Sequence, residues 1–211
     1  MYVVHLPNNP NLESSLEAWV SELRNFKAAL EKKFNVDITD EKLRTSIKWG
    51  NQQRRQMAAL YELGRLDPPA ITGTDMRKVM DGMQYIFDKR ERYAAIQEVL
   101  DTCIKNWEND NGPIKRGEKC PRILVSGGPS TGVFEKTIKV IEELGAVIVC
   151  YEGCSGIVSR RRMIEESDTK DPILCIAEKY IEVPCAVMSP NQRRLDQVAL
   201  TIDEWKVDGV V

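Results

Sequence analysis

The stretch from residue 122 to residue 156 most constrains the fold, because signals for a strand, a turn, a helix and a second strand follow one another there without interruption. A short apolar run at residues 123–125 ends in a glycine turn at residues 127–129. A run bounded by turn residues is typical of a strand buried on both faces. Apolar residues then recur at helical spacing over residues 134–144, and residues 146–150 form a second apolar run.

This order of signals predicts a β-α-β unit. Gly145 is expected to close the helix, since glycine is favoured just after a helix end. A right-handed crossover places the second strand parallel to the first. Ligands usually bind in the loops that follow the strands of such a sheet. The candidate site therefore comprises two loops, at residues 127–132 and 152–156.

The remainder of the C-terminal half continues the alternation of strand and helix. Helices are predicted at residues 172–180 and 195–205, and further strands at residues 184–188 and 207–211. Such alternation indicates a mostly parallel sheet with helices on its faces. We expect an α/β fold in which a helical N-terminal half leads into an open, mostly parallel, doubly wound sheet that is cut off at a strand.

The N-terminal half has helical periodicity. One helix is predicted over residues 12–30. A second is predicted over residues 39–63 with Thr39 as its N-cap, a third is capped by Thr74 or Asp75, and a fourth covers residues 89–107. An apolar, strand-like run precedes them at residues 2–6, and a polar linker follows them at residues 109–119.

These elements predict two parts. Residues 1–119 would form a strand plus a helical segment. Residues 120–211 would form a Rossmann-like or flavodoxin-like α/β lobe that is incomplete at its C-terminal end. Because the chain begins and ends on apolar runs, which leave strand edges unpaired, we expect it to be a fragment of a longer protein.

The composition narrows the function classes. The formal net charge is only −2, so nothing favours a nucleic acid or a membrane surface as partner. No apolar stretch has the length of a membrane span and no leader-like segment is found, so we expect a cytoplasmic location. The six cysteines are irregularly spaced in 211 residues, which favours reduced thiols or metal ligands over a disulfide framework.

The glycine turn after residue 125 is the first candidate binding element. It fits neither the G-x-G-x-x-G fingerprint of dinucleotide sites nor the lysine-containing loop of mononucleotide sites. A glycine-rich turn still lets main-chain N–H groups approach an anion. Gly127, Gly128 and Ser130 are therefore candidate ligand-binding residues. The alternative is a tight turn without a ligand.

The cysteines and arginines leave several interpretations open. Cys154 lies between glycines in the second loop, where it is either a metal ligand or reactive thiol, or only a loop thiol. Cys150 and Cys185 fall in apolar runs and are expected to be buried. The arginines at residues 160–162 and 193–194 either bind an anion or cover solvated helix faces. Zinc is not favoured, because the single histidine, at position 5, is remote.

Several motifs together resemble one family. They are PRILVSGGPSTG, EKTIKVIEELGAVIVCYEGCSG and DPILCIAEKYIEVPCAVMSPNQRRLDQVALTIDEWKVDGVV in the C-terminal half, and VVHLPNN, ITDEKLRTSI and NQQRRQMAALYELGRLDPPAITGTD in the N-terminal half. The chain is similar over nearly its whole length to the iron-sulfur subunits of the 2-hydroxyacyl-CoA dehydratase and benzoyl-CoA reductase family, which includes the double-cubane cluster proteins.

The resemblance implies an oxygen-sensitive enzyme that acts on an acyl-CoA. Such subunits hold a [4Fe-4S] cluster between two α/β lobes, so the resemblance implies that residues 1–119 form a segment that bridges the lobes. They work with a homologous second subunit or as a homodimer. An ATP-dependent iron-sulfur activator supplies one electron. In the dehydratases, that electron makes a ketyl radical of the thioester, and water then leaves from the (R)-2-hydroxyacyl group. The alternatives are a reductase subunit of the double-cubane or benzoyl-CoA type, or a non-catalytic module that binds a ligand or a partner.

One site residue carries over directly. Cys154 matches the cysteine of the family's D/N-x-C-[ST]-G loop and is the expected metal ligand. Double-cubane members usually have a cysteine where this chain has Gly127 or Gly128, which argues against an eight-iron cluster. The other cluster ligands would lie before Met1 and beyond Val211. We therefore expect the 211 residues alone to bind no cluster and to be inactive.

Overall fold

The described part of the chain divides into two compact units that interleave along the sequence. A computed structural model describes residues 1–128, 134–153 and 156–211. One unit combines residues 1–52 with residues 162–194, and the other combines residues 53–161 with residues 195–211. The division predicted after residue 119 concerned lobes of a larger protein and stays a prediction.

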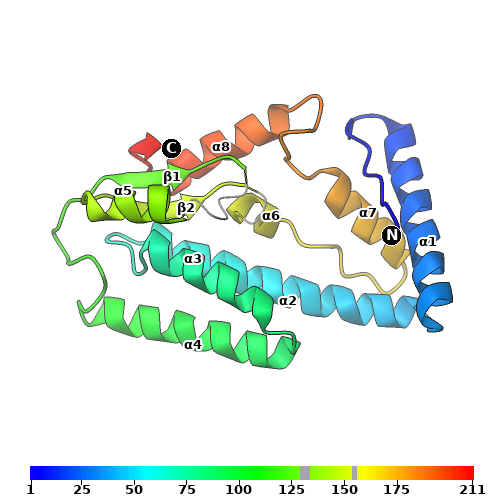
Figure 1. Cartoon of the computed structure of the whole chain (residues 1–211), viewed down its shortest axis with the longest axis horizontal. Helices are drawn as coiled ribbons and strands as arrows, with labels where there is room; N and C mark the ends of the chain where they lie inside the picture. Colours follow the sequence, from blue (N-terminus) through cyan, green and yellow to red (C-terminus); the bar gives the residue numbers. More distant parts are fainter. Residues whose placement is uncertain (129–133, 154–155) are drawn as a thin grey trace. The chain divides into compact units, whose positions relative to one another are not determined.

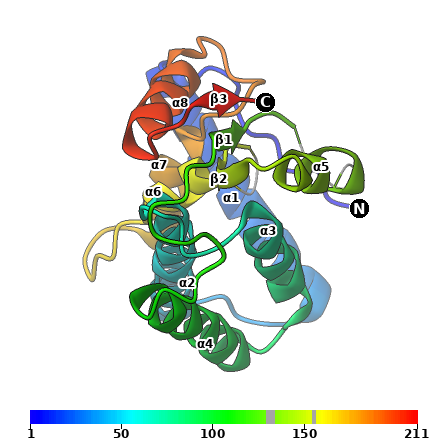
Figure 2. The same cartoon turned by 90° about the vertical axis from the view of Figure 1, so that its left-hand side faces the viewer.

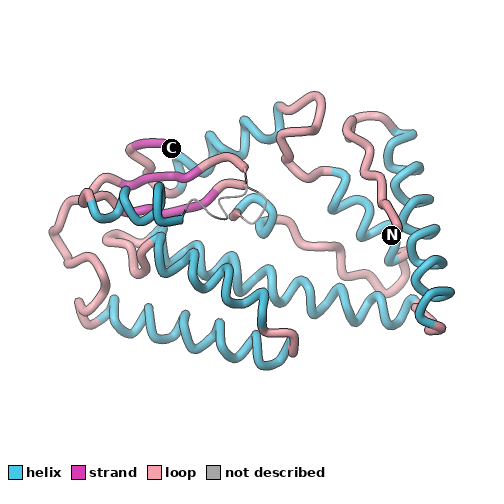
Figure 3. The backbone as a smooth tube through the Cα atoms, viewed as in Figure 1, coloured by secondary structure: helices cyan, strands magenta, loops and turns pink. Residues whose placement is uncertain are grey.

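Most of the predicted helices are confirmed (Figures 1 and 3). The helices are α1 (Glu13–Phe34), α2 (Asp40–Arg65), α3 (Gly73–Gly82), α4 (Lys89–Glu108), α5 (Lys139–Glu143), α6 (Ile157–Arg161), α7 (Pro172–Ile181) and α8 (Gln192–Glu204), with short turns η1 (Met83–Tyr85) and η2 (Phe134–Ile138). The strands are β1 (Arg122–Val125), β2 (Val147–Tyr151) and β3 (Gly209–Val210). None of the helices in the described ranges has the length and the apolar character needed to cross a membrane.

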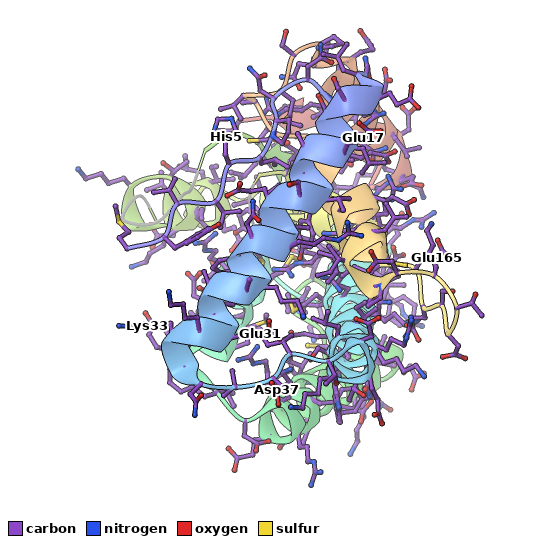
Figure 4. The ribbon with its side chains drawn as sticks, turned by 90° about the vertical axis from the view of Figure 1, so that its right-hand side faces the viewer. His5, Glu17, Glu31, Lys33, Asp37 and Glu165 are labelled. Atoms are coloured by element: carbon purple, nitrogen blue, oxygen red, sulfur yellow. The ribbon has the colours of Figure 1, made fainter. Side chains whose placement is uncertain are left out.

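The first unit is built on helix α1. Its apolar face packs on α7 through Trp19, Ala177 and Ile181. In the view of Figure 4, His5 lies on the N-terminal segment beside α1, and Glu31 lies near the loop that leads to Asp37. The Glu31 carboxylate holds the far end of this loop, because it accepts a hydrogen bond of 2.8 Å from the Ile38 main-chain N–H.

The polar first half of α2 anchors a long segment of the same unit. The buried side chain of Asn51 donates to the Ile164 carbonyl oxygen at 2.6 Å and accepts from the Ile164 N–H at 2.9 Å. Arg44 donates to the carbonyl oxygens of Ser167 and Lys170 at 2.6 and 2.8 Å. These hydrogen bonds satisfy main-chain groups of residues 164–170, which form neither a helix nor a strand and so lack regular main-chain hydrogen bonds.

Two predicted strands of the first unit are wrong. Residues 2–6 form no strand, because nothing in the described part of the chain pairs with them; instead the Tyr2 ring lies 5.3 Å from the Phe26 ring. Residues 184–188 form a turn, in which the Met188 N–H donates to the Cys185 carbonyl oxygen at 3.1 Å. Val187 is 71% exposed, so this apolar run is not a buried strand. Cys185, which was expected to be buried, is half-buried.

The second unit contains the sheet and confirms the α/β class. Among the described residues the sheet has three parallel strands in the order β2-β1-β3. Figure 2 shows α8 on one face of the sheet and α5 on the other. Helices on both faces are the arrangement that a doubly wound sheet predicts. The predicted last strand is confirmed as β3, although it is shorter than expected.

The core of this unit lies where the sheet meets α2, α3 and α4. Its largest fully buried side chains include the following: Met57, Leu60, Tyr61, Met76, Ile96, Leu124, Val147, Ile148, Val149 and Trp205. Two glycines let these helices approach the outer edge of β2. A Cβ on Gly64 would lie 2.2 Å from the Val149 carbonyl oxygen, and one on Gly73 would lie 2.3 Å from the Ile148 side chain. Gly64 therefore lies inside α2 as a packing residue, although the helix was predicted to end at residue 63.

Side chains at the helix ends fix how the elements join. Thr72, rather than the predicted Thr74 or Asp75, caps α3, because its hydroxyl accepts from the Asp75 N–H at 3.0 Å. The Glu142 carboxylate of α5 accepts from the N–H groups of Gly73 and Thr74 at 2.7 and 3.0 Å. A carboxylate at a helix N-terminus also interacts favourably with the helix dipole. The helix α5 is thereby tied to the start of α3.

Candidate functional site at the carboxyl edge of the sheet

The two loops predicted as the site follow adjacent parallel strands. Val125 of β1 is in register with Tyr151 of β2, so the loops that begin at Ser126 and Glu152 start side by side. The Glu152 N–H donates to the Val125 carbonyl oxygen at 2.8 Å, which extends the pairing by one residue. The prediction that these loops share one edge of the sheet is confirmed for their described residues.

A hydrogen bond between side chains joins the two loops. The Ser126 hydroxyl donates to a carboxylate oxygen of Glu152 at 2.6 Å. Glu152 is only 6% exposed, so its side chain is held within the protein at this edge. Neither residue was singled out from the sequence. The available signal was that each is the first polar residue after an apolar strand run.

The glycines of the loops take conformations that other residues rarely adopt. Gly127 has φ of +130° and Gly153 has φ of +154°. A Cβ on Gly153 would lie 2.8 Å from the Gly127 carbonyl oxygen, so the main chains of the two loops are in close approach. By contrast, a Cβ on Gly127 or Gly128 would meet no atom of the described residues within 4 Å, chain neighbours aside. Within the described ranges, nothing covers this side of the main chain of the first loop.

Two predicted site residues lie outside the described residues. Ser130 and Cys154 fall in the gaps at residues 129–133 and 154–155. The residues on either side of the second gap are tied to each other, because the Gly156 N–H donates to the Gly153 carbonyl oxygen at 3.0 Å. The assignments of Gly127, Gly128 and Ser130 to ligand binding and of Cys154 to metal binding stay predictions.

The described cysteines do not form a cluster site. Cys150 is fully buried, and its thiol donates weakly to the Tyr151 carbonyl oxygen at 3.8 Å. Burial raises the pKa of the Cys150 thiol far above its ordinary value, so the thiolate that would bind a metal is disfavoured. Among the described ranges, no three side chains of His, Cys, Asp and Glu are grouped so as to hold a metal ion. The described residues alone therefore do not fit an iron-sulfur cluster.

Three of the arginines considered as anion ligands make ion pairs within the protein. Arg161 donates to Glu204 at 2.5 Å and lies 5.3 Å from the centre of the Trp205 ring. Arg162 and Arg193 both pair with Glu182. These contacts account for the three side chains without a bound anion.

Comparison with known proteins identifies the family. Residues 1–211 match the family described as 2-hydroxyglutaryl-CoA dehydratase, D-component. The YjiM protein of Escherichia coli (strain K12), whose name assigns it to the dehydratase subunits, is 34% identical over 211 residues, which cover 100% of this chain and 54% of that protein. The (R)-phenyllactyl-CoA dehydratase beta subunit of Clostridium sporogenes is 25% identical over 213 residues, which cover 99% of this chain and 53% of that protein.

The chain thus spans about half the length of both curated relatives. The match runs through both halves of the sequence, as the motifs in the helical and the α/β part indicated, and it confirms the resemblance drawn from them. This chain belongs to the 2-hydroxyglutaryl-CoA dehydratase D-component family.

Proposed function

We propose that the chain is part of a subunit of a 2-hydroxyacyl-CoA dehydratase, which eliminates water from an (R)-2-hydroxyacyl-CoA. The observation that carries this proposal is the family match over all 211 residues, together with a relative named as an (R)-phenyllactyl-CoA dehydratase beta subunit. Because the chain spans about half of its relatives, the activity is proposed for the full-length protein.

The proposal includes a second subunit and an activator. Both relatives are named as subunits, which supports a partner subunit for this protein also. An ATP-dependent activator would supply one electron to the enzyme. A ketyl radical of the acyl thioester would then let an unactivated hydroxyl group leave as water.

A [4Fe-4S] cluster in the full-length protein is the remaining part of the proposal. Such a cluster supplies one-electron chemistry that amino-acid side chains lack. Cys154 is the proposed ligand from this chain. Among the described residues no His, Cys, Asp and Glu side chains are grouped so as to hold a metal ion, so the other thiolates would come from outside these 211 residues.

The loops at the carboxyl edge of the sheet are the proposed contact with the acyl-CoA. The main chain at Gly127 and Gly128, which no described residue covers, supports this assignment, and Ser130 follows in the same loop. The Glu152 carboxyl group, which accepts a hydrogen bond from Ser126, lies at the same edge. We propose that the acyl end of the substrate lies against these loops.

The test uses the full-length protein, reconstituted anaerobically with iron and sulfide. We expect it to bind iron and, with the activator, ATP and a reductant, to convert an (R)-2-hydroxyacyl-CoA to a product that lacks one water molecule, as measured by mass spectrometry. Cys154→Ala should lower the iron content and abolish the reaction. Cys185→Ala is the matched control, because it removes a half-buried thiol outside the loops.

The two parts of the proposal fail separately. If Cys154→Ala keeps the iron content of the unmodified protein, Cys154 is not a ligand. If the unmodified protein takes up no iron and leaves every 2-hydroxyacyl-CoA unchanged, the dehydratase assignment itself is wrong.

A further inference from the structure

A long groove runs along the second unit, away from the carboxyl edge of the sheet. It lies between the C-terminal half of α2 and α4, which are side by side in Figures 1 and 2, and the end of α8 contributes to it. Its volume is about 1060 Å³. This volume is at the upper end of the range of small-molecule pockets, about 300–1,000 Å³.

The floor of the groove is apolar and follows the helical repeat. Leu63 of α2 and Leu100 of α4 are buried at its base. Leu66 and Ile104 extend the apolar strip by one helical turn on each side, and Ile104 remains 37% exposed. An apolar strip between two neighbouring helices is the kind of surface onto which an amphipathic helix packs its own apolar face.

The rim of the groove is acidic. The lining holds six acidic and three basic side chains, a formal charge of −3. The acidic residues are Glu62, Asp67, Asp101, Glu108, Asp203 and Glu204, and the basic residues are Arg65, Lys105 and Lys206. Two of the basic groups are engaged in ion pairs within the lining, Arg65 with Glu62 at 3.3 Å and Lys206 with Asp67 at 3.8 Å. Glu204 is paired with Arg161, which lies outside the lining, at 2.5 Å, and with this partner counted the formal charge is −2. The net charge of the rim therefore attracts cations.

We propose that this groove binds a cationic amphipathic helix of a protein partner. The apolar strip would take the leucine-type face of such a helix, and the rim acids would pair with lysines or arginines along its edges. An acyl-CoA does not fit this surface, because its phosphates would meet an acidic rim. The inference is thus independent of the dehydratase assignment.

The probe for the test is a synthetic 18-residue helical peptide with a leucine stripe and lysines at all other positions. Its partner probe has the same leucines and glutamates in place of the lysines. With the full-length protein, fluorescence anisotropy should show that the lysine peptide binds at least tenfold more tightly than the glutamate peptide. Its affinity should fall as salt is raised from about 0.05 to 0.5 M, because salt screens rim charges.

Variants locate the binding. Asp101→Lys on α4 and Asp203→Lys on α8 reverse charges of the lining, and each should weaken the binding of the lysine peptide at least fivefold. Glu98→Lys makes the same charge change on α4 at a residue that does not line the groove, and should leave the affinity for the lysine peptide within twofold. Ile104→Ser should lower the affinity for both peptides, because it removes exposed apolar surface from the floor of the groove.

Three results would overturn the proposal. The first is that the lysine peptide does not bind. The second is that Glu98→Lys lowers the affinity for the lysine peptide as much as Asp101→Lys does. Binding would then come from non-specific electrostatic attraction and not from the groove. The third is self-association of the full-length protein that Ile104→Ser abolishes in analytical ultracentrifugation, since the occupant would then be a second copy of the protein.

Discussion

One hydrogen bond, between Ser126 and Glu152, joins the loops that follow β1 and β2. Its oxygen atoms are 2.6 Å apart, and the carboxylate lies almost entirely within the protein. A buried polar group that loses a partner destabilises the folded state because it also has no water to replace that partner. The bond therefore helps to hold together the first residues of the two loops that form the candidate site.

We predict that Ser126→Ala lowers the free energy of unfolding by about 1 kcal/mol. Ser126→Thr keeps the hydroxyl group and should lower the free energy of unfolding much less. The measurement is the midpoint of urea unfolding of the full-length protein. If the threonine variant is destabilised as much as the alanine variant, then the hydroxyl is not the source of the effect.

The sequence allowed the loops to be located, but not this bond within them. The glycine pattern at Gly127 and Gly128 and the apolar runs before each loop were local signals. That Ser126 would face Glu152 depends on the register of the strands, which pairs Val125 with Tyr151. Register is set by long-range packing, and a local pattern does not contain it.

At the scale of elements, periodicity predicted the helices and failed for two short apolar runs. The repeat over α1, α2 and α4 is long enough to be unambiguous. Residues 184–188 are apolar and begin with Pro184, yet they form a turn whose hydrogen bonds are local. A run of about five residues does not by itself distinguish a buried strand from a turn.

Gly64 illustrates a second limit, because its role in α2 depends on β2. The helix approaches the strand so closely that an added Cβ would lie 2.2 Å from the Val149 carbonyl oxygen. Gly82, at the end of α3, has helical φ and ψ of −62° and −39°, and among the described residues an added Cβ there would meet no atom within 4 Å beyond its chain neighbours and its own helix. The two glycines therefore form a matched pair for substitution.

We predict that Gly64→Ala lowers the free energy of unfolding by about 1–3 kcal/mol, because the backbone of α2 or β2 must shift. Gly82→Ala should instead raise it by about 0.4–1 kcal/mol, because alanine restricts the unfolded chain without strain in the helix. Urea unfolding of both variants measures the difference. Equal effects of the two substitutions would contradict a close approach at Gly64.

At the scale of the whole molecule, the two compact units are each assembled from separate stretches of the sequence. Helical periodicity identified α2 and α8, but it did not show that the unit boundaries fall inside both helices. Such grouping depends on contacts between residues far apart in the chain. It is therefore visible only once the packing is known.

The centre of the second unit buries three ionisable groups around β2, one thiol and two tyrosine hydroxyls. Burial raises the pKa of the Cys150 thiol and of the Tyr61 and Tyr151 hydroxyls far above their ordinary values. The two hydroxyls are held in hydrogen bonds, that of Tyr61 to the Met80 sulfur at 3.1 Å and that of Tyr151 to the Gly73 carbonyl oxygen at 2.8 Å. In the folded protein all three groups stay protonated well into the alkaline range.

This arrangement predicts that the protein loses stability at high pH. Below about pH 8.5 these groups are protonated in both the folded and the unfolded state, so they add no pH dependence. Above that pH the unfolded chain releases the Cys150 proton while the folded chain retains it. The free energy of unfolding then falls by up to about 1.4 kcal/mol per pH unit for each such group, with the tyrosines joining above about pH 10.

The Cys150→Ala variant isolates the thiol. The small cavity that it creates lowers its free energy of unfolding, relative to the unmodified protein, by an amount that does not change with pH. Between pH 9 and 10 the unmodified full-length protein should therefore lose about 1 kcal/mol more than this variant in urea unfolding. If the two pH profiles are parallel, then Cys150 ionises as readily in the folded protein as in the unfolded chain.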